Sequence, residues 1–93
     1  MSHGQLAELR QEITANSVEI LELLNRRAAL ALQVLAEKHR LGLPTFDSQR
    51  EEQLITEIIA QNQGPLPDAM VTELFQLIIK TSREFQQQQR MNT

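Results

Sequence analysis

The chain has 93 residues, of which 41% are hydrophobic and 23% are charged, which suits one domain with a modest core. Its net charge of −3 and its lack of Tyr and Trp argue against a nucleic-acid binder, which needs a basic face and stacking aromatic side chains. Without cysteine there is no disulfide, thiolate nucleophile or cysteine metal site. We see no signal-peptide pattern and no apolar run of membrane-spanning length, and we expect a cytoplasmic protein.

Residues 5–41 are predicted to form one long amphipathic helix, because neither Gly nor Pro interrupts them and one stripe recurs at three- and four-residue steps. The stripe comprises Leu6, Leu9, Ile13, Asn16, Ile20, Leu24, Arg27, Ala31, Val34 and Lys38. Alternatively, Asn16 and Glu19 form an N-cap pair that splits the segment into two helices. One helix would be about 55 Å long, against roughly 30–35 Å for a compact globule of this chain length. The helix therefore either breaks or lies against a second copy of itself.

Two cations occupy stripe positions where apolar residues are expected, and burying an unpaired cation costs several kcal/mol. Arg27 and Lys38 lie within about 20° of one helix face and roughly 16 Å apart, so both side chains could reach one small anion between them. Alternatively, such a residue fixes the register of a helix pair or bonds a Glu of a neighbouring helix. Arg10 lies about 25 Å from Arg27 and roughly 100° round the helix, so it could reach that anion only from a second, antiparallel copy.

A second helix is predicted to begin at Asp47 or Ser48 and to end near Gln61. The Gly-Leu-Pro sequence ending at Pro44 supplies the left-handed cap and the stop signal for the first helix. Glu51 lies on the inward side of the second helix, one turn before apolar residues. The Ser48-x-x-Glu51 spacing also fits a capping box, in which the Glu51 carboxylate bonds back to the Ser48 amide.

A third helix is predicted from Pro67 to about Gln89, with a polar turn before it. Ser82 and Gln86 follow Ile78 at four-residue steps, so two polar side chains extend an apolar face. Ser82 could instead bond back to the carbonyl one turn earlier, and Gln86 could be part of a solvated, glutamine-rich helix end. With no strand signal and no repeat, the predicted fold is all-α, with three helices of very unequal length.

Standard catalytic motifs are missing from the sequence. It contains no Ser-His-Asp set, no HExxH and no glycine-rich phosphate loop. An enzyme of this sequence is therefore expected to work without a metal, nucleophile or cofactor. Such chemistry depends on positioning the substrate and on electrostatic stabilisation.

Five motifs in order resemble those of the all-helical chorismate mutases, over nearly the whole of a single domain, residues 1–93. They are Leu9-Arg10, Leu23 to Arg27, Lys38, Phe46 to Glu51, and Phe75 to Gln86 with its Ser and Gln four residues apart. The resemblance implies an intertwined, domain-swapped homodimer whose long first helices pair and span both active sites. It also implies the Claisen rearrangement of chorismate to prephenate in phenylalanine and tyrosine synthesis, with no metal and no cofactor.

The same resemblance implies the catalytic residues. Arg10 of the partner chain and Arg27 hold the two substrate carboxylates, with the adjacent Arg26 as an alternative to Arg27. Lys38 and Gln86 donate to the ether oxygen, which gains negative charge as its C–O bond breaks. Relatives with Glu at the position of Gln86 need that acid protonated, so the amide predicts activity that persists at neutral pH.

Four further residues are implied in substrate binding. Glu51 and the backbone amide of Asp47 take the substrate hydroxyl, Arg50 steadies that corner, and Ser82 contacts a carboxylate. A sister group of the same fold eliminates pyruvate from isochorismate, so an isochorismate pyruvate lyase is an alternative. A non-catalytic regulatory module of an aromatic-pathway enzyme is another. Mutase domains of this family are often fused to other pathway enzymes, so association or fusion with one is also implied.

Overall fold

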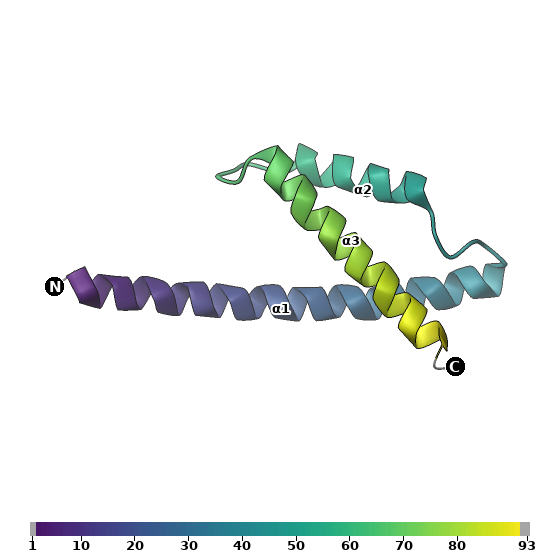
Figure 1. Cartoon of the computed structure of the whole chain (residues 1–93), viewed down its shortest axis with the longest axis horizontal. Coiled ribbons are helices and arrows are strands. Elements are labelled where there is room, and N and C mark those ends of the chain that lie inside the picture. The colour runs from purple at the N-terminus through teal and green to yellow at the C-terminus, as the bar shows by residue number, and fades with distance from the viewer. Residues whose placement is uncertain (1, 92–93) are drawn as a thin grey trace. The chain divides into compact units, whose positions relative to one another are not determined.

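The computed structural model describes residues 2–91, and three α-helices and no strand lie within that range (Figure 1). The helices are α1 (Ser2–Leu41), α2 (Ser48–Ala60) and α3 (Asp68–Met91). This confirms the prediction of an all-α chain with three helices of very unequal length. No helix in the described range is long and apolar enough to cross a membrane.

Helix α1 runs without a break, so the alternative of two helices separated at Asn16 is wrong. On either side of Asn16, the Thr14 hydroxyl donates to the Arg10 carbonyl at 3.0 Å and the Ser17 hydroxyl to the Ile13 carbonyl at 2.7 Å. Both hydroxyls thus bond back to the preceding turn of the same helix, as Ser and Thr do inside a continuous helix. Asn16 and Glu19, the residues that suggested a helix start, both lie within α1.

The predicted cap closes α1. Gly42 adopts a φ of 70°, and its N–H donates to the His39 carbonyl at 3.2 Å, while the Leu43 N–H donates to the Lys38 carbonyl at 2.8 Å. These two bonds are those of a Schellman motif, whose left-handed residue is usually glycine because a Cβ would be strained there. The cap turns the chain at a fixed place directly after Lys38.

The chain divides into two compact units, one ending at Leu30 and one beginning at Ala31. The first unit consists of α1 residues, and its large apolar side chains are exposed, from 40% for Leu24 to 66% for Ile13. The others are Leu6, Leu9, Val18, Ile20, Leu21, Leu23 and Leu30. So many exposed large apolar side chains are characteristic of an interaction surface.

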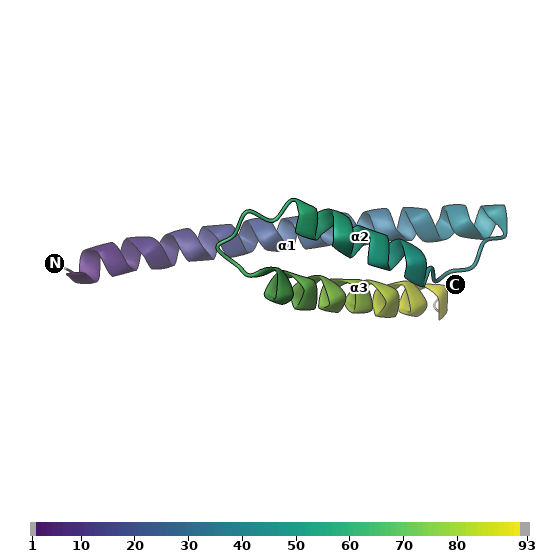
Figure 2. The ribbon, with the colours of Figure 1, turned by 90° about the horizontal axis from the view of Figure 1, so that it is seen from above.

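The second unit contains the last turns of α1 together with α2 and α3, and α2 packs against α3 (Figure 2). Val71 and Ile79 of α3 are its most buried residues, each 8% exposed. The apolar residues of α2 face the same core and are half-buried; they are Leu54, Ile55, Ile58 and Ile59. These are the residues whose spacing predicted the second helix.

The turn between α2 and α3 is organised by one amide side chain. Asn62 Nδ2 donates to the Leu66 carbonyl at 2.9 Å and to Asp68 Oδ1 at 2.7 Å, and Asn62 Oδ1 accepts from the Gly64 N–H at 3.1 Å. Pro67 lies just before α3, not within its first turn, because its carbonyl accepts the Val71 N–H at 3.1 Å as the first acceptor of the helix. The polar turn is confirmed, and α3 begins one residue later than predicted.

Candidate functional site

The second unit contains six of the eight predicted site residues. They are Lys38, Asp47, Arg50, Glu51, Ser82 and Gln86. Arg10 and Arg27 belong to the first unit, so they are considered separately below. Within the second unit, Lys38 comes from α1, Arg50 and Glu51 from α2, and Ser82 and Gln86 from α3, while Asp47 directly precedes α2.

Lys38 is held near the end of α1 by the loop that follows it. Its half-buried Nζ donates to the Thr45 carbonyl at 3.0 Å, and within residues 2–91 no carboxylate lies at ion-pair distance from it. The alternative in which a Glu neutralises Lys38 therefore finds no support within this chain. An ammonium group has three N–H donors, so two remain for a ligand.

Gln86 is fixed against α1 by a hydrogen bond from α3. Its Nε2 donates to the Ala31 carbonyl at 2.9 Å, and the side chain is half-buried, whereas the next residue, Gln87, is exposed. Gln86 is therefore not simply part of a solvated glutamine run. Ala31 and Lys38 are two turns apart on the same α1 stripe, about 10 Å along the axis. The amide has a second N–H donor, so one more donor is available on this face.

Asp47 is the N-cap of α2. It has an extended backbone, with φ −138° and ψ 92°, and its carboxylate accepts the Arg50 N–H at 3.1 Å. The Ser48 capping box is therefore wrong, because the cap lies one residue earlier and the Glu51 carboxylate is bound elsewhere. Within the described range, the Asp47 backbone N–H makes no hydrogen bond, so this donor is available to a ligand.

Glu51 forms a two-point ion pair with Arg83 of α3. Arg83 Nε donates to Glu51 Oε2 at 2.7 Å, and Arg83 Nη2 donates to Glu51 Oε1. The Arg83 guanidinium also lies over the Phe46 ring, 4.9 Å from its centroid. Sequence reasoning missed Arg83, although a signal was present: it follows buried Ile79 by four residues, which places it on the packed face of α3.

The other two residues of α2 and α3 differ in their surroundings. Arg50 is exposed, and its Nη1 lies 3.7 Å from Glu57 Oε2 of the same helix. Ser82 is half-buried, and its hydroxyl makes no hydrogen bond among the described residues, so the bond back to the preceding turn is not formed. Ser82 thus offers an unused hydroxyl, whereas Arg50 is directed along its own helix.

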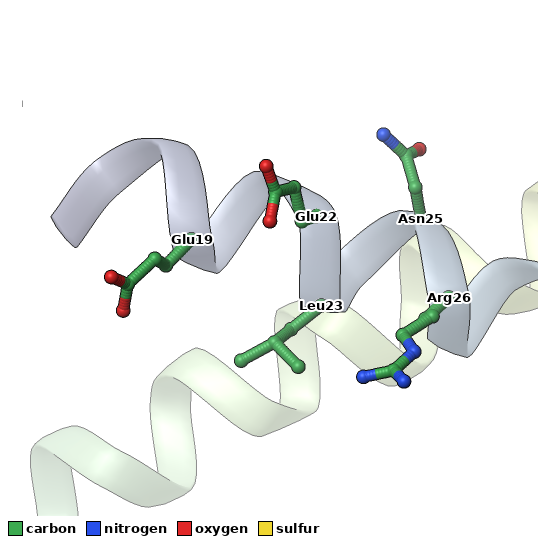
Figure 3. Close-up of a pocket in the computed structure, with 5 residues that line it drawn as sticks. All are labelled: Glu19, Glu22, Leu23, Asn25 and Arg26. Carbon is green, nitrogen blue, oxygen red and sulfur yellow. The ribbon is translucent and has the colours of Figure 1, made fainter. Parts of the chain in front are cut away.

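In the first unit, the side chains of Arg10 and Arg27 make no ion pair with described residues. Arg26 lines a shallow surface hollow together with other α1 side chains, namely Glu19, Glu22, Leu23 and Asn25. Arg26 and Leu23 extend toward one side of the helix there and Asn25 toward the other (Figure 3). Arg27 does not line this hollow, so the two adjacent arginines have different surroundings.

No metal centre is visible in the part of the chain that the structure describes, because no group of three or more His, Cys, Asp or Glu could hold an ion there. Among the predicted site residues of the second unit, the groups with unused hydrogen-bond donors are the Lys38 ammonium, the Gln86 amide, the Ser82 hydroxyl and the Asp47 backbone N–H. All four can donate hydrogen bonds, which suits an anionic ligand rich in acceptor oxygens.

The fold places the chain in the class of small all-helical proteins. The family model described as chorismate mutase type II matches residues 9–87, and the chain belongs to this family. The family resemblance predicted from the five motifs is therefore confirmed. Among solved structures, chorismate mutase (Form II) from Thermus thermophilus is similar, with a TM-score of 0.88 and 35% identity, covering 91% of this chain and 97% of that one.

Curated relatives include both long and short proteins. A bifunctional chorismate mutase/prephenate dehydratase of Escherichia coli (strain K12) is 37% identical over 95 residues, or 98% of this chain and 25% of the relative. That of Aquifex aeolicus is 34% identical over 81% of this chain and 22% of the relative. A chorismate mutase of Methanocaldococcus jannaschii is 29% identical over 90% of this chain and 86% of the relative. The chain thus spans about a quarter of the bifunctional relatives.

Proposed function

We propose that this chain catalyses the rearrangement of chorismate to prephenate. The observation that carries the proposal is the pair of donors on one face of α1: Lys38 Nζ, and Gln86 Nε2 bonded to the Ala31 carbonyl. Each has N–H groups left over, and neither is paired with a carboxylate. Membership of the chorismate mutase type II family supplies the substrate for which such donors are suited.

The reaction breaks the C–O bond of the enolpyruvyl ether and forms a C–C bond within the same molecule. As the C–O bond breaks, the ether oxygen gains negative charge, and Lys38 and Gln86 donate to it. Donors that are already fixed need no reorganisation at that moment. Removing one such donor typically costs about 2.7–4 kcal/mol, or roughly a hundred- to thousandfold in rate.

The two substrate carboxylates are assigned to Arg27 and to Arg10 of a second copy, with the Ser82 hydroxyl as a further donor. Binding both carboxylates selects the folded conformer in which the reacting carbons approach each other. A homodimer with paired first helices is supported by the exposed apolar side chains of α1 and by the length of that helix. Arg10 would then serve the pocket of the other chain.

The substrate hydroxyl is assigned to Glu51 and the Asp47 backbone N–H. The unused N–H and the capped start of α2 support this corner, because the cap holds the two residues in register. Arg50 would have to leave Glu57 in order to steady the same corner. Its assignment therefore has less structural support than those of Glu51 and Asp47.

The experiment is the loss of chorismate absorbance in the near ultraviolet, with the product identified by chromatography. The chain has no Tyr or Trp, so its own absorbance is low. We expect prephenate to form without added metal or cofactor, and Lys38→Ala to lose at least about a hundredfold in kcat with its oligomeric state intact. Prephenate formation by Lys38→Ala at the wild-type rate would remove Lys38 from the mechanism. Turnover of isochorismate alone would indicate the lyase.

The shared site can be tested with two inactive variants, Arg10→Ala and Lys38→Ala. If Arg10 serves the other chain, a mixed dimer has one site with both defects and one intact site. Free exchange of equal amounts makes half the dimers mixed, so about a quarter of wild-type activity should return. If exchange is shown to occur and no activity returns, Arg10 does not act across the dimer.

A second enzyme of the aromatic pathway is proposed as a fused or associated partner. Its support is that the bifunctional relatives are about four times longer than this chain and carry a prephenate dehydratase name. Copurification of such an activity with the full-length natural protein would support it. The cytoplasmic location expected from the sequence stays a prediction.

A further inference from the structure

Arg83 is a half-buried cation for which the function proposed above has no role. Three contacts fix its guanidinium: Nε to Glu51 Oε2 at 2.7 Å, Nη2 to Glu51 Oε1, and the Phe46 ring centroid 4.9 Å from its central carbon. The contacts reach the start of α2 and the loop before it, so one side chain of α3 joins both. Arginine suits this arrangement because its planar fork matches a carboxylate and its face stacks on an aromatic ring.

Stability alone does not account for this pair. The side chains of Arg83 and Glu51 are 38% and 27% exposed, and ion pairs with such access to water contribute little to folding. The pair does determine the direction of the Glu51 carboxylate. Each carboxylate oxygen can accept a second hydrogen bond, so the two-point pair leaves acceptor positions open for a hydroxyl.

The charge of Arg83 matters as well as its geometry. Chorismate carries two carboxylates, and an uncompensated Glu51 carboxylate would repel it. The Arg83 guanidinium, paired directly with the Glu51 carboxylate, neutralises this negative charge. Arg50 does not do this, because its side chain lies beside Glu57 on the exposed side of α2.

We propose that Arg83 is a positioning residue for substrate binding, which holds Glu51 in place to accept the substrate hydroxyl and cancels its charge toward the anionic substrate. This rests on the proposed function, since it needs a substrate with both groups. The hydroxyl takes no part in the bonds that break and form. The contribution is therefore equal in the ground state and the transition state, and it appears in KM and not in kcat.

The test compares Arg83→Gln with Lys80→Gln, a matched control one turn earlier on α3. Lys80 is exposed and makes no ion pair with any described residue, so its loss changes the net charge equally without disturbing Glu51. We expect Arg83→Gln to raise the KM for chorismate at least about tenfold with kcat within about threefold of wild type. Arg83→Lys keeps the positive charge but not the two-point geometry, so its KM for chorismate should lie between those of the wild type and Arg83→Gln. Lys80→Gln should remain within about twofold of wild type in both constants.

A double-mutant cycle with Glu51→Gln shows whether Arg83 acts through Glu51. In the Glu51→Gln background, Arg83→Gln should raise KM by no more than about threefold further, because there is no charge left to cancel. Equal effects in both backgrounds, or an Arg83→Gln that behaves like Lys80→Gln, would overturn the inference while the proposed function stands. If Arg83→Gln does not fold, the test rests on Arg83→Lys. A KM for chorismate equal to that of the wild type in Arg83→Lys would then overturn the inference. A folded wild-type protein without chorismate turnover would overturn both.

Discussion

Replacing Gln86 by Glu tests the proposed role of the amide most directly, because the two side chains have nearly the same shape. In the structure, Gln86 Nε2 donates to the Ala31 carbonyl at 2.9 Å. An ionised carboxylate cannot donate, and it would face both that carbonyl and the ether oxygen of the substrate. A protonated carboxyl has one O–H and can replace one donor. Activity of Gln86→Glu should therefore depend on pH where the wild type does not.

The single O–H of the protonated acid can donate to the Ala31 carbonyl in the free protein or to the ether oxygen in the substrate complex, and ionisation removes whichever bond is made. Loss of the donor to the ether oxygen should lower kcat about a hundred- to thousandfold at pH 7.5. Loss of the bond to Ala31 should cost about 1 kcal/mol of folding stability, which corresponds to about 4–8 °C in Tm for a chain of this size. Because ionisation is disfavoured in the fold, the pKa of the new carboxyl should lie above its ordinary value of about 4.3. The stability is therefore complete below the unfolded pKa and is lost as pH rises through the folded one.

The assay is kcat against pH from about 4.5 to 8, followed by chorismate absorbance, with circular dichroism melting at both ends of that range. Gln87→Glu is the matched control, since Gln87 is exposed and this substitution adds the same negative charge at the next position. It should keep the pH profile of the wild type. A folded Gln86→Glu with wild-type kcat at pH 7.5, or one that regains no activity at low pH, would refute the role of Gln86 as a donor to the ether oxygen.

Two further predictions concern the helix ends. Asp47→Ala should lower the free energy of unfolding by about 1 kcal/mol because the α2 cap is lost, whereas Ser48→Ala should change it little; circular dichroism melting compares the two, and equal losses would contradict the observed cap. The hydrogen bond from Arg40 holds the pKa of the exposed Glu37 carboxyl below its ordinary value of 4.5, so the stabilisation exists above that value and is lost as pH falls through the folded pKa. An NMR titration should show a low titration midpoint for the Glu37 carboxyl in the wild type and an ordinary one in Arg40→Gln. If the midpoint were the same in both proteins, the pair would not form in solution.

The helices could be predicted from the sequence because local signals agree with one another. Apolar residues at three- and four-residue steps predicted all three, and glycine with a following proline predicted the end of α1 at the place where the Schellman motif forms. Where two local signals competed, the outcome depended on contacts distant in sequence. Ser48 with Glu51 fitted a capping box, but Glu51 is bound by Arg83, 32 positions further along the chain. Because the Glu51 carboxylate is bound to Arg83, it does not bond back to the Ser48 amide, and Asp47 is the N-cap of α2.

Predictions of the site differed in quality for the same reason. Lys38 and Gln86 became candidates because a polar residue on an apolar stripe is conspicuous in any helix, and their roles in the site stay predictions. Arg83 could not be found so readily, since its meaning depends on the charge opposite it on α2 and a single sequence does not say which helix faces interact. Periodicity gives the packed side of a helix, but it does not give the partner. Opposite charges on the packed faces of α2 and α3 were the available signal.

The stripe on α1 relates the proposed dimer to the proposed chemistry. Its first half, from Leu6 to Leu24, is exposed and apolar except for Asn16, and its second half holds Lys38 and the Ala31 carbonyl that anchors Gln86. An apolar surface of that length needs a covering partner, and a second copy would bring its own Arg10 with it. Covering the stripe and completing the cationic site would then be the same event. A chain of 93 residues could thus obtain both a larger core and a further cation for the site without any additional element of structure.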